Sequence, residues 1–194
     1  MIEAAIVLGI VGLVVGGIWV AATSVYANLR SKKATDELLA ITQAVRNVYA
    51  TSSNIGTSLT APDFTTDMAQ ANVLPTDVMA AGVASNSTAA TTLNPWSGNI
   101  AVISANNTTT FGVRFTNIPP AACVDFAMRN AGTAHDAGMI GVTGEANGTP
   151  GAALPVAAVV LTPGVGISLA QAQAQCLSNA NNARNLVFRF NLKG

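Results

Sequence analysis

The segment MIEAAIVLGIVGLVVGGIWVAA, residues 1–22, is apolar except for one carboxylate, Glu3. The apolar run continues to Asn28, and no basic residue appears before Arg30. At about 1.5 Å per residue, a helix of this length can cross a bilayer, which needs about 20 apolar residues. The run is too long for the apolar region of a signal peptide, and no basic region precedes it. We therefore expect residues 1–28 to form a membrane-spanning helix.

Beyond Asn28 the pattern changes without a proline or a turn signal. Apolar residues recur there at helical spacing and form one stripe, consisting of Ala34, Leu38, Ile41, Val45 and Val48. Charged and polar residues lie off this stripe, so the second half of the helix is amphipathic. The sequence predicts one helix from about residue 2 to about residue 50, ended by the polar residues 52–56, with its stripe packed on a folded head.

Four glycines lie in the first half of this helix, at Gly9, Gly12, Gly16 and Gly17. Gly12 and Gly16 have the spacing that lets two helices approach closely in lipid, although glycine is also simply common in membrane helices. The adjacent Gly16 and Gly17 weaken the helix by about 1 kcal/mol each relative to alanine. They mark where the helix could melt if the segment left the membrane and repacked.

The remaining residues predict an α+β head. Turn signals and alternation favour strands at 99–104, 109–118, 139–144, 155–161 and 185–192, with a hairpin turn at 105–108. Helices are expected at 63–73, 76–83, 121–132 and 168–180, the last two with Gly132 as a C-cap and Ser168 as an N-cap. A long helix packed on a mainly antiparallel sheet is the simplest arrangement of these elements.

This pattern predicts two regions. Residues 1–28 form the hydrophobic helix, and residues 29–194 form the head. Within the head we expect the amphipathic half of the helix at about 29–53, a connecting region at 54–94 and a sheet region at 95–194.

Composition argues against nucleic-acid binding. The 194 residues include nine Lys and Arg and nine Asp and Glu, giving a formal net charge of zero. Apart from Arg30, Lys32 and Lys33, the basic residues are scattered, whereas binding to phosphates needs a basic patch. Half of the residues are hydrophobic and 9% are charged, which favours a membrane or assembly protein.

Two cysteines, Cys123 and Cys176, lie in the second half of the chain. Two thiols and the single histidine cannot supply an ordinary four-ligand zinc site. The cysteines are either two buried free thiols or a disulfide, and the exported character of the N-terminus favours the disulfide. Such a bridge would close the C-terminal region and stabilise the head by about 4 kcal/mol.

No catalytic, cofactor-binding or metal-binding residue is predicted, so we expect no enzyme. His135 and Asp136 are neighbours, but adjacent side chains point different ways and no G-x-S-x-G motif accompanies them. We interpret His135 as a solvated loop residue. The stretch PGVGISL at 163–169 lacks the third glycine and the lysine of a phosphate-binding loop, which favours an ordinary turn.

The apolar helix with an early glutamate, continuing as an amphipathic helix into a sheet domain with a late cysteine pair, resembles the type IV pilins. MIEAAIVLGIVGLVV is similar to their N-terminal signature. NPWSGNIAVISANNTTTFGVRFTNIPPAAC followed by VDFAMRNAG, then SLAQAQAQC and NLVFRFNLKG, resemble the type IVb subclass of bundle-forming, toxin-coregulated and thin conjugative pilins. Residues 51–92 and 133–166 match poorly.

The resemblance implies the major structural subunit of a filament. It implies an inner-membrane precursor whose leader is removed by a prepilin peptidase and whose new N-terminus is methylated. An inner-membrane assembly platform then extracts subunits, so that their helices bundle as the core of an extracellular fibre. Adhesion, aggregation, motility and conjugative contact are the roles of such fibres. The alternatives are a type II secretion pseudopilin and, more remotely, a membrane-anchored binding domain.

In pilins the early glutamate pairs with the N-terminal amine of a neighbouring subunit, which implies a role for Glu3 and Met1 in setting the subunit register. A buried carboxylate without a partner is costly, so such a pair is satisfied only at one alignment. Four residues usually precede this glutamate in the family, whereas two precede it here. Either a leader and two mature residues come before Met1, or the mature end is shorter.

Overall fold

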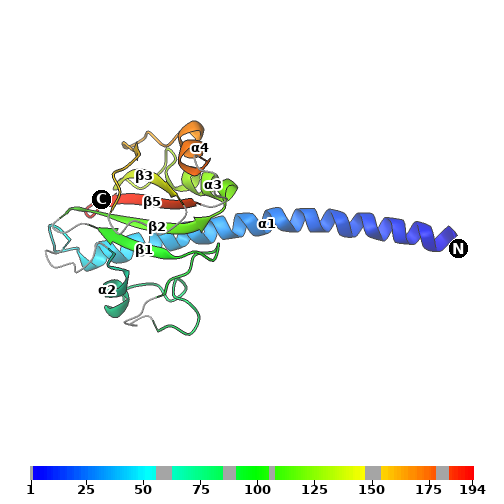
Figure 1. Cartoon of the computed structure of the whole chain (residues 1–194), viewed down its shortest axis with the longest axis horizontal. Coiled ribbons are helices and arrows are strands. Elements are labelled where there is room, and N and C mark those ends of the chain that lie inside the picture. The colour runs from blue at the N-terminus through cyan, green and yellow to red at the C-terminus, as the bar shows by residue number, and fades with distance from the viewer. Residues whose placement is uncertain (1, 56–62, 85–90, 105–107, 147–153, 178–183) are drawn as a thin grey trace.

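A computed structural model describes residues 2–55, 63–84, 91–104, 108–146, 154–177 and 184–194. Its first element is α1, Ile2–Val48, a continuous helix of 47 residues. At 1.5 Å per residue this helix is about 70 Å long. Figure 1 shows it as a rod whose N-terminal half projects away from a folded head, while its C-terminal half lies along that head. The single long helix is confirmed.

The head is built on a sheet of five strands in which every neighbouring pair is antiparallel. The strands are β1 (Ile100–Ser104), β2 (Thr110–Ile118), β3 (Met139–Ala146), β4 (Val159–Val160) and β5 (Arg184–Asn191). Their order is β1-β2-β5-β3-β4, so β5, the latest strand in the chain, lies in the middle. The predicted α+β class with a mainly antiparallel sheet is confirmed.

Among the described residues of the head there are three shorter helices: α2 (Thr65–Gln70), α3 (Pro120–Asn130) and α4 (Leu169–Leu177). Both α1 and α4 pack against α3, and α1 also contacts β2. Phe126 of α3 lies at the centre of an aromatic cluster, with ring centroids 5.0 Å from Phe115, 5.1 Å from Phe188 and 5.4 Å from Trp96. This cluster fastens α3 to the sheet, and so it fixes the surface on which α1 rests.

The sheet is covered on both faces. Alternation in β5 predicts Leu186, Phe188 and Phe190 inward and Val187 outward, yet Val187 is also fully buried. A side chain added at Gly112 would collide with Leu154, so the segment near residue 154 covers this second face. A central strand enclosed on both sides reads as a nearly continuous apolar run.

Several predicted elements differ from the structure. Residues 76–83 form a turn and an isolated bridge between Met79 and Thr92, because their backbone groups bond to residues 91–93 instead of closing helical turns. The strand expected at 155–161 is reduced to the two residues of β4. α3 ends with Ala131 as its C-cap, one residue before Gly132.

One predicted helix start can be checked in the structure, whereas a predicted turn and a predicted helix end cannot. The N-cap at Ser168 is confirmed, since its hydroxyl accepts from the Gln171 N–H at 3.2 Å. The predicted turn at 105–108 lies mostly outside the described residues, as does the end of the helix expected to reach residue 180.

Candidate functional site

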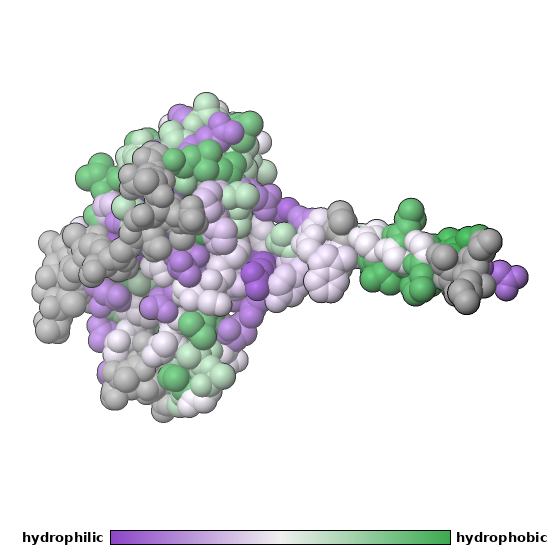
Figure 2. Space-filling view, turned by 45° about the vertical axis from the view of Figure 1, so that its right-hand side comes forward, coloured by the Kyte–Doolittle hydropathy of each residue, from purple (hydrophilic) through white to green (hydrophobic). Residues whose placement is uncertain are grey.

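The exposed part of α1, residues 6–29, is called the stalk below. Its large apolar side chains are half to four-fifths exposed, from Val11 at 51% to Leu13 at 79%. Its most apolar 18 residues have a mean hydropathy of 2.4, and none of that stretch is buried in the head. By length and composition this helix can cross a membrane. Figure 2 shows apolar side chains along the projecting rod. A surface of this kind needs a partner that removes it from water.

Glu3 lies in the first turn of α1 and is exposed. Its predicted partner, Met1, lies outside the described residues. A negative charge in the first turn suits the positive end of the helix dipole. The register role of Glu3 therefore stays a prediction about contacts between chains.

None of the four stalk glycines serves packing within one chain. A side chain added at Gly9, Gly12, Gly16 or Gly17 would meet nothing within 4 Å. The helix is continuous through Gly16 and Gly17, so neither residue breaks it in the single chain. The small surfaces at these positions are open to another helix, and their roles in packing and melting stay predictions.

The C-terminal half of α1 packs its apolar stripe on the head. Ala34, Leu38, Ile41 and Val45 are buried, each at most 1% exposed. Val48 is 43% exposed, so the prediction that it belongs to the packed stripe was wrong. The helix ends at Val48, and the next contact is made by Tyr49, whose ring packs edge-on to Phe64 at 6.5 Å.

A polar seam joins α1 to α3. The Ser31 hydroxyl donates to Asp125 at 2.6 Å, and the Asn130 side chain donates to the Thr35 hydroxyl at 3.2 Å. Nearer the stalk, Arg129 donates to the side-chain oxygen of Asn28 at 3.1 Å. These bonds fix the direction in which the stalk leaves the head.

Arg46 and Asp136 form a second connection, near the end of α1. Both Nη atoms of Arg46 donate to the Asp136 carboxylate, at 2.8 and 2.9 Å. The Gly138 N–H also donates to this carboxylate, at 2.7 Å. The hydrogen bonds from Arg46 lower the pKa of Asp136, although partial burial opposes them. Asp136 is therefore held by α1. His135, beside it, contacts the Gly132 carbonyl through Nδ1 at 2.7 Å.

Glu37 is a buried acid that the stripe pattern did not reveal. Its side chain is 1% exposed, and neither carboxyl oxygen has a hydrogen-bond partner among the described residues. Lys33 Nζ lies 3.6 Å away, which is long for a hydrogen bond, and its side chain is 56% exposed. Burial raises the pKa of Glu37 to about 7; Lys33 opposes this rise, and Asp77 and Asp36 add to it.

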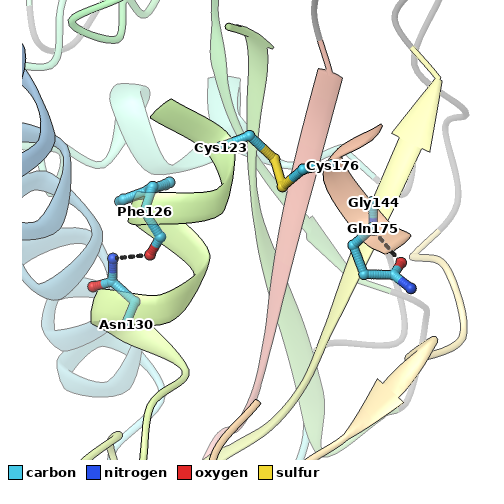
Figure 3. Close-up of a disulfide and its surroundings, with 6 residues drawn as sticks. All are labelled: Cys123, Phe126, Asn130, Gly144, Gln175 and Cys176. Atoms are coloured by element: carbon cyan, nitrogen blue, oxygen red, sulfur yellow. Dashed lines mark hydrogen bonds between the residues drawn. A yellow bond between two sulfur atoms is a disulfide. The ribbon is translucent and has the colours of Figure 1, made fainter. Parts of the chain in front are cut away.

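The cysteines form a disulfide between α3 and α4, so the favoured alternative is confirmed. Cys123 and Cys176 are 53 residues apart, and both are buried. Figure 3 shows the bridge joining the two helices. Beside it, the Gly144 N–H of β3 donates to the Gln175 side chain at 2.9 Å, which fastens α4 to the sheet.

The head from its first residues on α1 to the end of β5 matches one family. Residues 29–191 match the family described as PilS, N-terminal, which is more than four-fifths of the chain. The chain belongs to the PilS family of type IVb pilins.

This pilin is similar to a pilus subunit of known sequence and to a solved pilin structure. It is 29% identical over 150 residues to the major structural subunit of bundle-forming pilus from Escherichia coli O127:H6, strain E2348/69 (EPEC), covering 76% of this chain and 72% of that protein. The NMR structure of the type IVb pilin PilS from Salmonella typhi is 19% identical, with a TM-score of 0.38, and the comparison covers 78% of this chain and 92% of that one.

Sequence reasoning found the stalk, the disulfide and four residues of the stripe, but it missed the polar contacts of the pilin. Arg46 and Asp136 are 90 residues apart in the sequence, and no local pattern joins them. Glu37 carried a weak signal, since it lies three residues after Ala34 and four before Ile41, both predicted core residues, on a helix that must pack. A helical wheel alone puts such a residue at the margin of the buried face.

Proposed function

We propose that this pilin is the major structural subunit of a type IVb pilus and polymerises through the stalk into a surface fibre. The observation that carries the proposal is the stalk itself, an apolar helix that is exposed along residues 6–29 and attached to a head that is already folded. A helix of that surface is stable only in lipid or against other apolar helices. In a fibre core, the stalks of other copies of the same chain are these apolar helices.

Before assembly, the stalk anchors the subunit in the inner membrane, with residues 1–28 as the membrane segment and residues 29–194 as the head. A prepilin peptidase and an inner-membrane assembly platform are the partners that act at this stage. In the fibre, other copies replace the lipid around the stalk, and the heads form the outer surface. Adhesion, aggregation, motility or conjugative contact would then act through the heads.

Glu3 sets the alignment of neighbouring stalks in this proposal. It is the one charged residue among residues 1–28, and an unpaired carboxylate in an apolar core is costly. The Glu3 carboxylate is satisfied at one axial position, where it pairs with the N-terminal amine of a neighbouring copy. Met1 provides this amine if the mature chain begins there. The open surfaces of Gly9 and Gly12 allow close helix contacts, and Gly16 and Gly17 provide a weak point where α1 could unwind during extraction.

Negative-stain microscopy of material sheared from the cell surface tests the proposal. Fibres that contain this chain as their main protein are the expected result. Fibres without this chain, or the chain only in short periplasmic assemblies, would contradict it.

The role of Glu3 is tested with Glu3→Ala and Glu3→Val, beside Asp36→Asn as a control that removes one exposed charge from the same helix. We expect the Glu3 variants to accumulate in the membrane without fibres, while the control assembles. Normal fibres from Glu3→Val would refute the register role and leave the subunit role intact.

A further inference from the structure

A groove of about 570 Å³ lies where the stalk meets the head. One wall is α1 between Thr23 and Ser31, and the other is the beginning of α3. Ala27 of α1 and Ala121 and Ala122 of α3 line the groove, and these three small apolar side chains are called its floor below. The groove therefore has an apolar floor, and hydroxyl and charged groups of α1 lie around it.

The position of the groove along α1 decides what it meets in the membrane-anchored subunit. Residues 6–25 span about 30 Å as a helix, which equals the hydrocarbon thickness of a bilayer. Tyr26 then lies at the hydrocarbon boundary, where aromatic side chains are favoured. Arg30, four residues further on, lies about 6 Å beyond this boundary, among the lipid headgroups. The groove thus opens at the level of lipid phosphates.

Arg30 has donors left for an anion. Its Nη2 contacts the Tyr26 hydroxyl at 3.3 Å, and its guanidinium lies 4.5 Å from the centre of that ring. Within the described part of the chain, no carboxylate forms an ion pair with Arg30. The acid that lines the groove, Asp125, already accepts from the Ser31 hydroxyl at 2.6 Å and from Arg129 at 2.8 Å. A guanidinium carries five N–H donors, and a phosphate oxyanion suits them.

We propose that this groove binds one anionic phospholipid, with the lipid phosphate on Arg30 and the glycerol and first acyl carbons against Ala27, Ala121 and Ala122. The proposal rests on the membrane-anchored stage of the proposed function. The charge of the groove and its depth in the membrane both favour a lipid. The groove combines an available cation at the level of the headgroups with an apolar floor on the side towards the hydrocarbon. The bound lipid holds the head at a fixed tilt to the membrane, and it leaves when the stalk enters the fibre.

Native mass spectrometry of the full chain in neutral detergent tests this, with phosphatidylglycerol, phosphatidylcholine or inorganic phosphate added. We expect one phosphatidylglycerol per chain, retained about ten-fold more strongly than phosphatidylcholine, and no competition from inorganic phosphate. Arg30→Gln should weaken phosphatidylglycerol retention by about ten-fold or more, since charge-assisted hydrogen bonds are lost. Ala122→Phe, which fills the floor, should weaken both lipids.

Lys32→Gln is the matched control, because it removes the same charge from α1 two residues away and Lys32 does not line the groove. Its retention of phosphatidylglycerol should stay within about two-fold of the unchanged pilin. Equal losses in Arg30→Gln and Lys32→Gln would show general surface attraction and overturn the proposal. Equal retention of both lipids, competition by inorganic phosphate, or a dimer in place of the lipid complex would also overturn it. The measurement uses separate subunits, so its failure leaves the fibre test unaffected.

Discussion

Glu37→Gln is expected to stabilise the pilin strongly at pH 8 and only slightly at pH 5. The reason is the burial of the Glu37 side chain on α1, without a hydrogen-bond partner for either carboxyl oxygen among the described residues. Ionising a carboxyl group there leaves a charge that, among the described residues, is offset by the largely exposed Lys33 ammonium at 3.6 Å. A glutamine of the same size keeps the packing and removes that charge.

The magnitude follows from the pKa of Glu37, which rises from 4.5 in the unfolded chain to about 7 in the folded one. Below pH 4.5 the carboxyl group is protonated in both states, and there its burial reduces the stability of the folded pilin least. As the pH rises through 4.5, the unfolded chain ionises first and the folded state loses stability, until the folded state also ionises above pH 7. The loss between pH 5 and pH 8 is about 2.5 kcal/mol.

Urea denaturation of the full chain in neutral detergent measures this loss of stability. Unfolding is followed at pH 5 and pH 8 through the fluorescence of Trp96, which is buried in the head. With a slope of about 2 kcal/mol per molar urea, the midpoint of the unchanged pilin should fall by about 1 M relative to the variant. Asp36→Asn removes a neighbouring exposed charge that makes the smallest contribution to the raised pKa of Glu37, so this control should keep most of the pH dependence of the unchanged pilin. If Glu37→Gln lost as much stability between pH 5 and pH 8 as the unchanged pilin, the reasoning would be refuted.

Three further predictions concern the head. Replacing Cys123 and Cys176 by serine should lower the free energy of unfolding by about 4 kcal/mol, measured by urea denaturation, because the bridge closes a loop of 53 residues; an unchanged midpoint would contradict this. Gly144→Ala should cost about 1–3 kcal/mol, since the new methyl group would collide with a backbone oxygen of α4, and hydrogen exchange should show α4 opening first. Asp136→Asn should cost about 2 kcal/mol at pH 7 through its bonds with Arg46, and this difference should shrink as the pH falls through 3.8 towards the lowered pKa of Asp136; a difference that does not shrink below pH 3.8 would refute the ion pair as its source.

The length of α1 could be predicted because two different patterns continue through Asn28 without interruption. The apolar half is recognised by composition, and the amphipathic half by the recurrence of Ala34, Leu38, Ile41 and Val45. Val48 fits the same recurrence but lies where the head ends, and periodicity carries no information about the extent of the surface opposite.

Local propensity failed where tertiary partners compete for the backbone. Residues 76–83 contain helix formers, yet the Leu93 N–H bonds to the Val78 carbonyl, and this long-range pairing replaces a helical turn. The same limit applies to β4, whose apolar run of seven residues pairs with β3 at two positions. The polar contacts Ser31–Asp125 and Arg46–Asp136 join residues that only the finished fold brings together.

The position of β5 has a consequence for how the head is made. β2 and β3 precede it in the chain, and each pairs with β5 rather than with the other. Until residues 184–191 join the sheet, one edge of β2 and one edge of β3 stay open. Open strand edges at high local concentration pair with one another. Addition of β5 therefore competes with pairing of these open edges between chains, and the last residues of the head decide when that competition ends.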